Sequence, residues 1–120
     1  MSFINISNHP SARWEAAQLK AACIIGGSVV DYPFPPVNPQ ATTSDVDTHM
    51  RNFIMGIPIA HDDVVHIMGE MGFVFAFVKE MQRRGIRCVQ STTERVSVEN
   101  EDGTKTTKFN FVQFRDYSTY

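Results

Sequence analysis

Three short segments of this 120-residue chain carry most of the side chains that could bind or transform a ligand. They are residues 7–9, 69–70 and 91–95. Hydroxyl, amide and guanidinium groups can hold phosphate oxygens or a ribose. An imidazole can give or take a proton near neutral pH. The segments therefore predict a polar ligand site. The candidate catalytic residues are His9, Ser91 and Arg95, and the candidate ligand-binding residues are Ser7, Asn8, Arg13, Gly69, Glu70, Thr92 and Thr93.

Each candidate also has a purely structural interpretation. Gly69 could let a ligand approach the backbone closely, or it could simply make a turn. Glu70 is better explained as a helix-start carboxylate than as a general base. His9 could be a proton donor or a turn residue, and the hydroxyls of residues 91–93 could bond only to nearby backbone. The residues alone leave these alternatives open.

Common catalytic and metal motifs are missing from the sequence. The four histidines lack the HxxxH and HExxH spacings, so we predict no metal site, and nothing indicates a cofactor. There is no GxGxxG, GxxxxGK[ST] or GxSxG motif. Two cysteines, Cys23 and Cys88, are too few for a disulfide scaffold or a four-cysteine zinc site, and we expect both in the core.

Composition sets the class of protein. A length of 120 residues with 42% hydrophobic residues fits one domain, residues 1–120, with a real core. A net charge of -2 argues against binding long DNA or RNA but leaves room for a small anionic ligand. No apolar run reaches membrane-spanning length, so we expect no membrane association. The start lacks a signal-peptide pattern, and we expect a cytoplasmic protein.

Hydrophobic periodicity and turn residues divide the chain into strands and helices. Prolines at 33, 35, 36 and 39 predict a stiff, extended loop. An Asp102-Gly103 pair predicts the turn of a β-hairpin over about 95–115. The expected strands are 3–6, 29–32, 64–68 and 86–90, and the expected helices are 12–25, 71–84 and one from a cap at 42–44 to about 55.

The order of these elements predicts an α/β fold. It is a Rossmann-like, mainly parallel sheet with helices on both faces and a C-terminal hairpin extension. Ligands bind such sheets outside the carboxyl ends of the strands, where the strand order reverses. Residues 7–9, 69–70 and 91–95 are all expected in loops at those ends, so they should share one pocket.

The same segments carry a resemblance to a known family. The sequence resembles small stand-alone CARF-type, Rossmann-like CRISPR-associated proteins of type III systems. The residues that carry it are Ser7-Asn8-His9-Pro10, residues 31–35, the Gly69-Glu70 junction, residues 91–95 and the ending at 109–115. The resemblance covers most of the chain.

The resemblance implies a homodimer that binds a cyclic oligoadenylate second messenger between its subunits. Several such proteins are ring nucleases, which cleave the ring without metal by attack of a ribose 2′-hydroxyl and so switch off signalling. Carried over to this chain, Gly69 and the following N–H groups would cradle phosphate. Ser91, Thr92 and Arg95 would bind and stabilise it, and His9 would be the acid or orienting group.

Two other functions remain open. The protein could bind the messenger without cleaving it, as a sensor or sponge. It could also be a small nucleotide-binding or protein-interaction domain unrelated to CRISPR, with helix 71–84 and the hairpin as partner surfaces.

Overall fold

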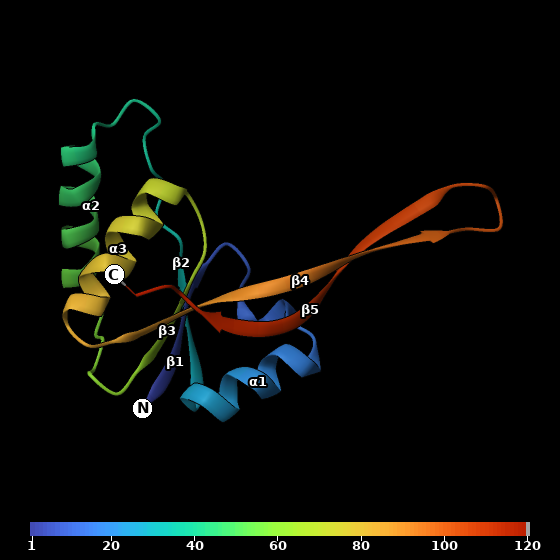
Figure 1. Ribbon diagram of the computed structural model, residues 1–120, viewed down its shortest axis with the longest axis horizontal. Helices are drawn as coiled ribbons and strands as arrows, with labels where there is room; N and C mark the ends of the chain where they lie inside the picture. Colours follow the sequence, from blue (N-terminus) through green and yellow to red (C-terminus); the bar gives the residue numbers. More distant parts are fainter. Residues whose placement is uncertain (120) are drawn as a thin grey trace.

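The computed structural model describes residues 1–119, which form five strands, three α-helices and one 3-10 turn (Figure 1). No helix among these residues is long and apolar enough to cross a membrane. The strands are β1 (Ser2–Ser7), β2 (Ser28–Pro33), β3 (Val64–Ile67), β4 (Arg87–Glu99) and β5 (Lys105–Asp116). The helices are the 3-10 turn Ser11–Arg13, α1 (Ala16–Gly26), α2 (Thr43–Met55) and α3 (Met71–Arg83).

The five strands make one sheet in the order β2-β1-β3-β4-β5. The first four run parallel, and β5 pairs with β4 in the antiparallel direction. Helix α1 lies on one face of the sheet, and α2 and α3 cover the other (Figure 1). The predicted α/β, Rossmann-like sheet with a C-terminal hairpin is therefore confirmed.

Alternating residues of the central strands sort into two different faces. On the side of α2 and α3, Ile4 and Ile6 belong to a large cluster of buried apolar side chains. On the side of α1, Phe3 belongs to a smaller apolar cluster, and its β1 neighbour Asn5 is a buried polar residue. The larger cluster also contains Val65, Ile67, Phe73, Phe77 and Met81.

The first helix begins later than its periodicity predicts. Trp14 and Glu15 have extended backbone angles, and α1 starts at Ala16 instead of residue 12. The indole N–H of Trp14 donates to the carbonyl of His9 at 3.0 Å, and its ring packs edge-on against Phe3. These contacts hold Trp14 against the sheet, outside the helix. Cys23, on α1, is exposed, so the expectation that it lies in the core is wrong.

Residues 91–95 form the middle of a strand, and the expectation of a loop there is wrong. Strand β4 continues without a break to Glu99 because β5 pairs along it, and the β-branched Thr92 and Thr93 favour a strand. A bulge interrupts the register, since Thr92 opposes Gln113 but Thr93 opposes Phe111.

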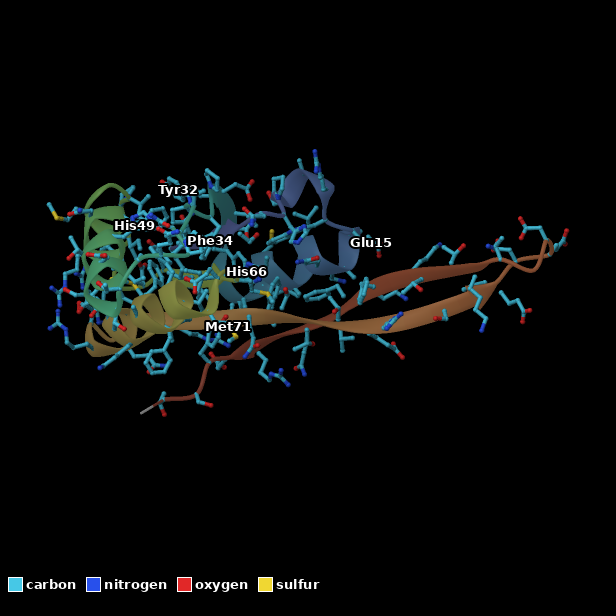
Figure 2. The ribbon with its side chains drawn as sticks, turned by 90° about the horizontal axis from the view of Figure 1, so that it is seen from above. Glu15, Tyr32, Phe34, His49, His66 and Met71 are labelled. Carbon is cyan, nitrogen blue, oxygen red and sulfur yellow. The ribbon has the colours of Figure 1, made fainter. Side chains whose placement is uncertain are left out.

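The hairpin projects far beyond the rest of the molecule, as both overall views show (Figures 1 and 2). Its turn spans Asn100 to Thr104 and uses Gly103 at a φ of +84°, so the predicted Asp-Gly turn is confirmed. The radius of gyration is 16.1 Å, against roughly 14 Å for a compact domain of this length. The extended arm accounts for the difference.

Candidate functional site

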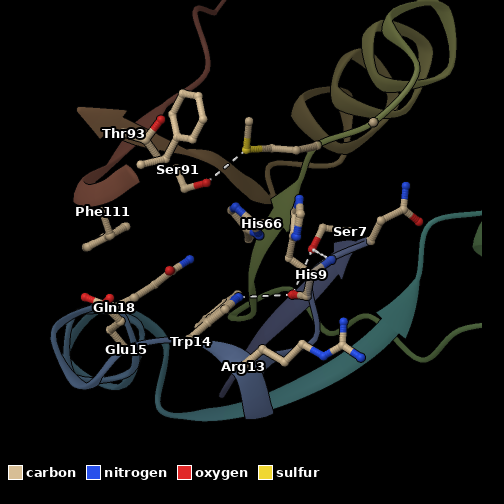
Figure 3. Close-up of a pocket in the computed structure, with 14 residues that line it drawn as sticks. Ser7, His9, Arg13, Trp14, Glu15, Gln18, His66, Ser91, Thr93 and Phe111 are labelled. Atoms are coloured by element: carbon tan, nitrogen blue, oxygen red, sulfur yellow. Dashed lines mark hydrogen bonds between the residues drawn. The ribbon is translucent and has the colours of Figure 1, made fainter. Parts of the chain in front are cut away.

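A pocket of about 580 Å³ lies on the α1 side, at the carboxyl ends of β1 and β3 (Figure 3). The chain goes from β1 to β2 on one side and places β3 on the other, so the strand order reverses there. This is where α/β sheets bind ligands. Of the ten predicted site residues, seven line the pocket: Ser7, Asn8, His9, Arg13, Gly69, Ser91 and Thr93.

The other three predicted residues do not line it. The Thr92 hydroxyl donates to the carbonyl of Gln113 at 3.3 Å. Arg95 is exposed and lies farther along β4 than Thr93, toward the tip of the hairpin. Because β4 is a strand, residues 91–95 do not turn toward the pocket together as a loop would. The guanidinium that lines the pocket belongs to Arg13.

Glu70 caps helix α3. Its carboxylate accepts hydrogen bonds from the backbone N–H groups of Gly72 at 2.8 Å and Phe73 at 2.9 Å. This is the helix-start role that its position favours. These two N–H groups, which the resemblance assigned to a phosphate, are thus already paired within the chain.

Gly69 is required by packing. A Cβ atom at this position would lie 2.5 Å from the Cδ2 and Cζ atoms of Phe34. Phe34 itself is buried against Phe73, with ring centroids 5.3 Å apart. The missing side chain therefore makes room for an aromatic ring from the proline-rich loop, a reason that neither sequence interpretation included.

A network of polar groups lies beneath the pocket and centres on Asn5. The amide nitrogen of Asn5 donates to Asp31 at 2.8 Å and to the carbonyl of His9 at 3.0 Å. Both partners are acceptors, which fixes the orientation of the amide. The amide oxygen then accepts from the Ser7 hydroxyl at 2.9 Å and from Nδ1 of His66 at 2.8 Å. His66 therefore carries its proton on Nδ1, and Nε2 presents a lone pair.

Asp31 ties this network to the loop that follows β1. Its carboxylate accepts from the backbone N–H of Ser11 at 3.0 Å and from the Ser11 hydroxyl at 2.6 Å. Burial alone would raise the pKa of Asp31, but the hydrogen bonds from Ser11 and Asn5 outweigh it and hold the pKa below its ordinary value. The carboxylate is thus ionised at neutral pH and orders the loop that carries His9.

His66 is the most unusual residue of the site. It lines the pocket but is only 2% exposed, and its Nε2 has no hydrogen-bond partner within residues 1–119. The rings of Phe3, Trp14 and Phe114 surround it at centroid distances of 5.3 to 6.0 Å. Burial, with a smaller effect from the charge on His9, lowers the pKa of His66 to about 4.

The site thus combines groups of three kinds. Arg13 and the hydroxyls of Ser91 and Thr93 can donate to anionic oxygens, His66 can accept, and Trp14 and Phe111 offer aromatic walls. Figure 3 shows His66 between Trp14, His9 and Ser91. Within residues 1–119, no group of three or more His, Cys, Asp or Glu side chains could hold a metal ion.

Residues 1–115 match the model of the family described as Uncharacterized protein MJ1673 family. The match spans nearly the whole chain, and the chain belongs to this family. No curated protein matches the sequence of this chain.

Proposed function

We propose that this member of the MJ1673 family binds a cyclic oligoadenylate in the pocket at the end of β1 and β3 and cleaves it without a metal ion. The observation that carries the proposal is the content of that pocket. A guanidinium, the hydroxyls of Ser91 and Thr93 and a buried histidine with an unpaired nitrogen line one cavity together with aromatic side chains. Phosphates, riboses and a flat base need this set of partners.

The size and charge of the site favour a small nucleotide ligand over a polymer. A volume of about 580 Å³ lies within the range of small-molecule sites. The protein has a net charge of -2, and Arg13 is the one cationic side chain of Arg or Lys type among the lining residues that the structure describes. The resemblance to CARF-type proteins adds the cyclic form of the ligand and the link to type III CRISPR signalling.

Cleavage would need three things from outside the ring: a proton acceptor, a proton donor and stabilisation of the charge on phosphorus. The ribose 2′-oxygen forms a bond to the neighbouring phosphorus and gives its proton to a water molecule, and the bond from phosphorus to the 5′-oxygen breaks. The 5′-oxygen takes up a proton, and the product ends in a 2′,3′-cyclic phosphate. His9 is the proposed proton donor, and Arg13 and Ser91 would stabilise the charge on phosphorus. Arg13 takes the role that the sequence assigned to Arg95.

An exposed apolar surface supports a homodimer as part of this proposal. Met71 and Phe75, one turn apart on α3, are 83% and 74% exposed. They border a second hollow, of about 770 Å³, which shares Met68 and Gly69 with the pocket. A second copy on this surface would bring two pockets close together around one ring. Phe75→Asp should shift the protein to monomer in sedimentation experiments, and an unchanged dimer would place the interface elsewhere.

The direct test incubates the protein with cyclic tri-, tetra- and hexaadenylate in EDTA and separates the products by chromatography. We expect linear products that end in 2′,3′-cyclic phosphate. A ring that binds in calorimetry but is recovered intact would reduce the function to a sensor or sponge. The absence of binding heat with every ring would overturn the proposal and favour a protein-interaction domain.

Two arginine variants sharpen the test. Arg13→Ala should weaken binding of the ring by about tenfold, because it removes a charged donor from the pocket. Arg95→Ala is the matched control, since Arg95 is exposed and outside the lining, and it should leave affinity unchanged. The reverse result would move the phosphate site out onto the hairpin.

A further inference from the structure

We infer that His66 recognises the exocyclic amino group of an adenine, with Nε2 of the imidazole accepting a hydrogen bond from the base. This inference rests on the proposed function, because it assigns one residue of the same pocket to one part of the ligand. It makes His66 a specificity-determining residue, and it leaves the cleavage step to other groups.

The orientation of the ring supports this role. Nδ1 is held by the amide oxygen of Asn5 at 2.8 Å, and Asn5 is itself fixed by Asp31 and the carbonyl of His9. The ring cannot turn Nε2 toward a protein partner without breaking that bond. Buried polar atoms are rarely left unpaired in folded proteins, and His66, whose buried Nε2 is unpaired, is one of the residues that line the pocket. The pocket is therefore the place from which a ligand group can supply the missing partner.

The protonation state of the ring determines what that partner can be. Burial keeps the imidazole of His66 neutral at pH 7, with a pKa of about 4, and the charge on His9 acts in the same direction. The other charged groups around the site are Arg13 and Glu15 at the pocket and Asp31 behind Asn5. A neutral ring with its proton on Nδ1 offers a lone pair, so it attracts an N–H or O–H group and repels phosphate oxygens and carbonyl groups.

The surroundings of Nε2 favour the amino group of a base over a ribose hydroxyl. Trp14 and Phe111 line the pocket together with His66, and flat aromatic walls are the usual partners of a nucleobase. The rings of Phe111 and Phe114 pack together with their centroids 4.8 Å apart, and this contact holds Phe111 in place next to the site. An adenine that stacks against these rings can direct its amino group at His66.

The experiment compares three cyclic tetranucleotides by calorimetry: the adenylate ring, an inosine ring in which a carbonyl replaces each amino group, and a 2′-deoxyadenylate ring. We expect the inosine ring to bind at least about tenfold more weakly, because the carbonyl faces a lone pair. The deoxy ring should bind within about threefold of the adenylate ring. Equal binding of the inosine ring overturns the inference. Loss of binding by the deoxy ring alone would identify a hydroxyl as the donor and overturn it as well.

Two further measurements keep the inference separate from the proposed function. In nitrogen-15 spectra, AMP should shift the Nε2 signal of His66, and IMP should not. That result would support the inference even if no ring binds, in which case the proposed function alone fails. Absence of a shift with both AMP and the adenylate ring overturns the inference.

A matched pair of variants tests the residue itself. His66→Gln should reduce the preference for the adenylate ring over the inosine ring to less than about threefold. His61→Gln changes an exposed histidine outside the pocket and should retain the full preference. An unchanged preference in His66→Gln overturns the inference. If that variant fails to fold, the ligand series and the spectra of the natural protein decide.

Discussion

The face of the sheet under α2 and α3 and the face under α1 share the same strands but bury different chemistry. The first packs Ile4, Ile6 and the rings of α3 into one apolar cluster. The second has a small apolar cluster and, beside it, the buried polar residues Asn5 and His66. Asn5 and His66 are direct neighbours in the register of β1 and β3.

This difference shows how a short chain can combine stability with a site. Because neighbouring residues of a strand point to opposite faces, each residue that fills the core fixes the direction of the next one. Burial of Ile4 and Ile6 on one side therefore holds Asn5 on the other. The apolar face makes the sheet rigid. On the polar face, Asn5 and His66 are therefore held in fixed positions.

The largest expected effect is on the apolar face. Phe77 is fully buried and packs against Phe53 and Phe73, so Phe77→Ala should lower the free energy of unfolding by about 3–5 kcal/mol. Urea denaturation measures this loss. Ser91→Ala, on the pocket side, should cost much less, and equal losses for the two variants would remove the distinction between the faces.

The next effect belongs to the polar face and depends on pH. The pKa of His66 is about 4 in the folded protein against an ordinary value of 6.5, because burial disfavours its charged form. The unfolded chain therefore binds more protons between these values, and stability should fall as the pH drops from about 6.5 to 4. The stabilisation is fully present above pH 6.5, and its loss should reach about 3 kcal/mol.

The matched comparison for this prediction is His66→Gln, which removes the titrating group. Its stability should change much less than that of the natural protein over the same pH interval in urea titrations. Asp31 and Glu80, whose pKa values are lowered, also destabilise the fold when protonated, but at lower pH. Parallel curves for the two proteins from pH 6.5 to 4 would contradict the assignment to His66.

A smaller effect is expected where the two faces meet. Gly69→Ala places a Cβ atom against the Phe34 ring and should lower the free energy of unfolding by about 1–3 kcal/mol. In the background of Phe34→Leu, the same glycine substitution should cost less, because a smaller side chain makes room. Chemical denaturation of the four proteins measures this coupling, and strictly additive losses would show that the two residues do not compete for space.

The smallest expected effect concerns the start of α3. Glu70→Ala removes a carboxylate that accepts from two backbone N–H groups and should cost about 1 kcal/mol in thermal or urea unfolding. Glu101→Ala, at the exposed tip of the hairpin, is the control and should change stability by less than about 0.5 kcal/mol. A larger effect at Glu101 would mean that the tip of the hairpin contributes to the stability of the whole protein.

Local signals made most of the fold predictable. The capping box between Thr42 and Asp45 marks the start of α2, and the Asp102-Gly103 pair marks the hairpin turn. Such features depend on residues close in sequence. Local signals did not predict that residues 91–95 form a strand. These residues pair with β5, which lies some twenty residues further along the chain.

The central pair of the site was missed for a related reason. Asn5 lies in a short apolar run, and His66 lies between Val65 and Ile67, so each looks like a single polar residue in a strand. Only the parallel register of β1 and β3 makes them partners. The available signal was the alternation of Phe3, Asn5 and Ser7 against Ile4 and Ile6, which places the polar residues of β1 on one face.

The bulge in the hairpin adds one residue to β5 without changing which residues of β4 face the two phenylalanines that flank it. Thr93 opposes Phe111, Ser91 opposes Phe114, and Val112 is the extra residue between them, more than half exposed. Deletion of Val112 would leave both aromatic residues opposite the same partners on β4. Related chains can therefore differ by one residue at this position, and engineers can remove that residue from β5, while Phe111 stays opposite Thr93 in the wall of the pocket.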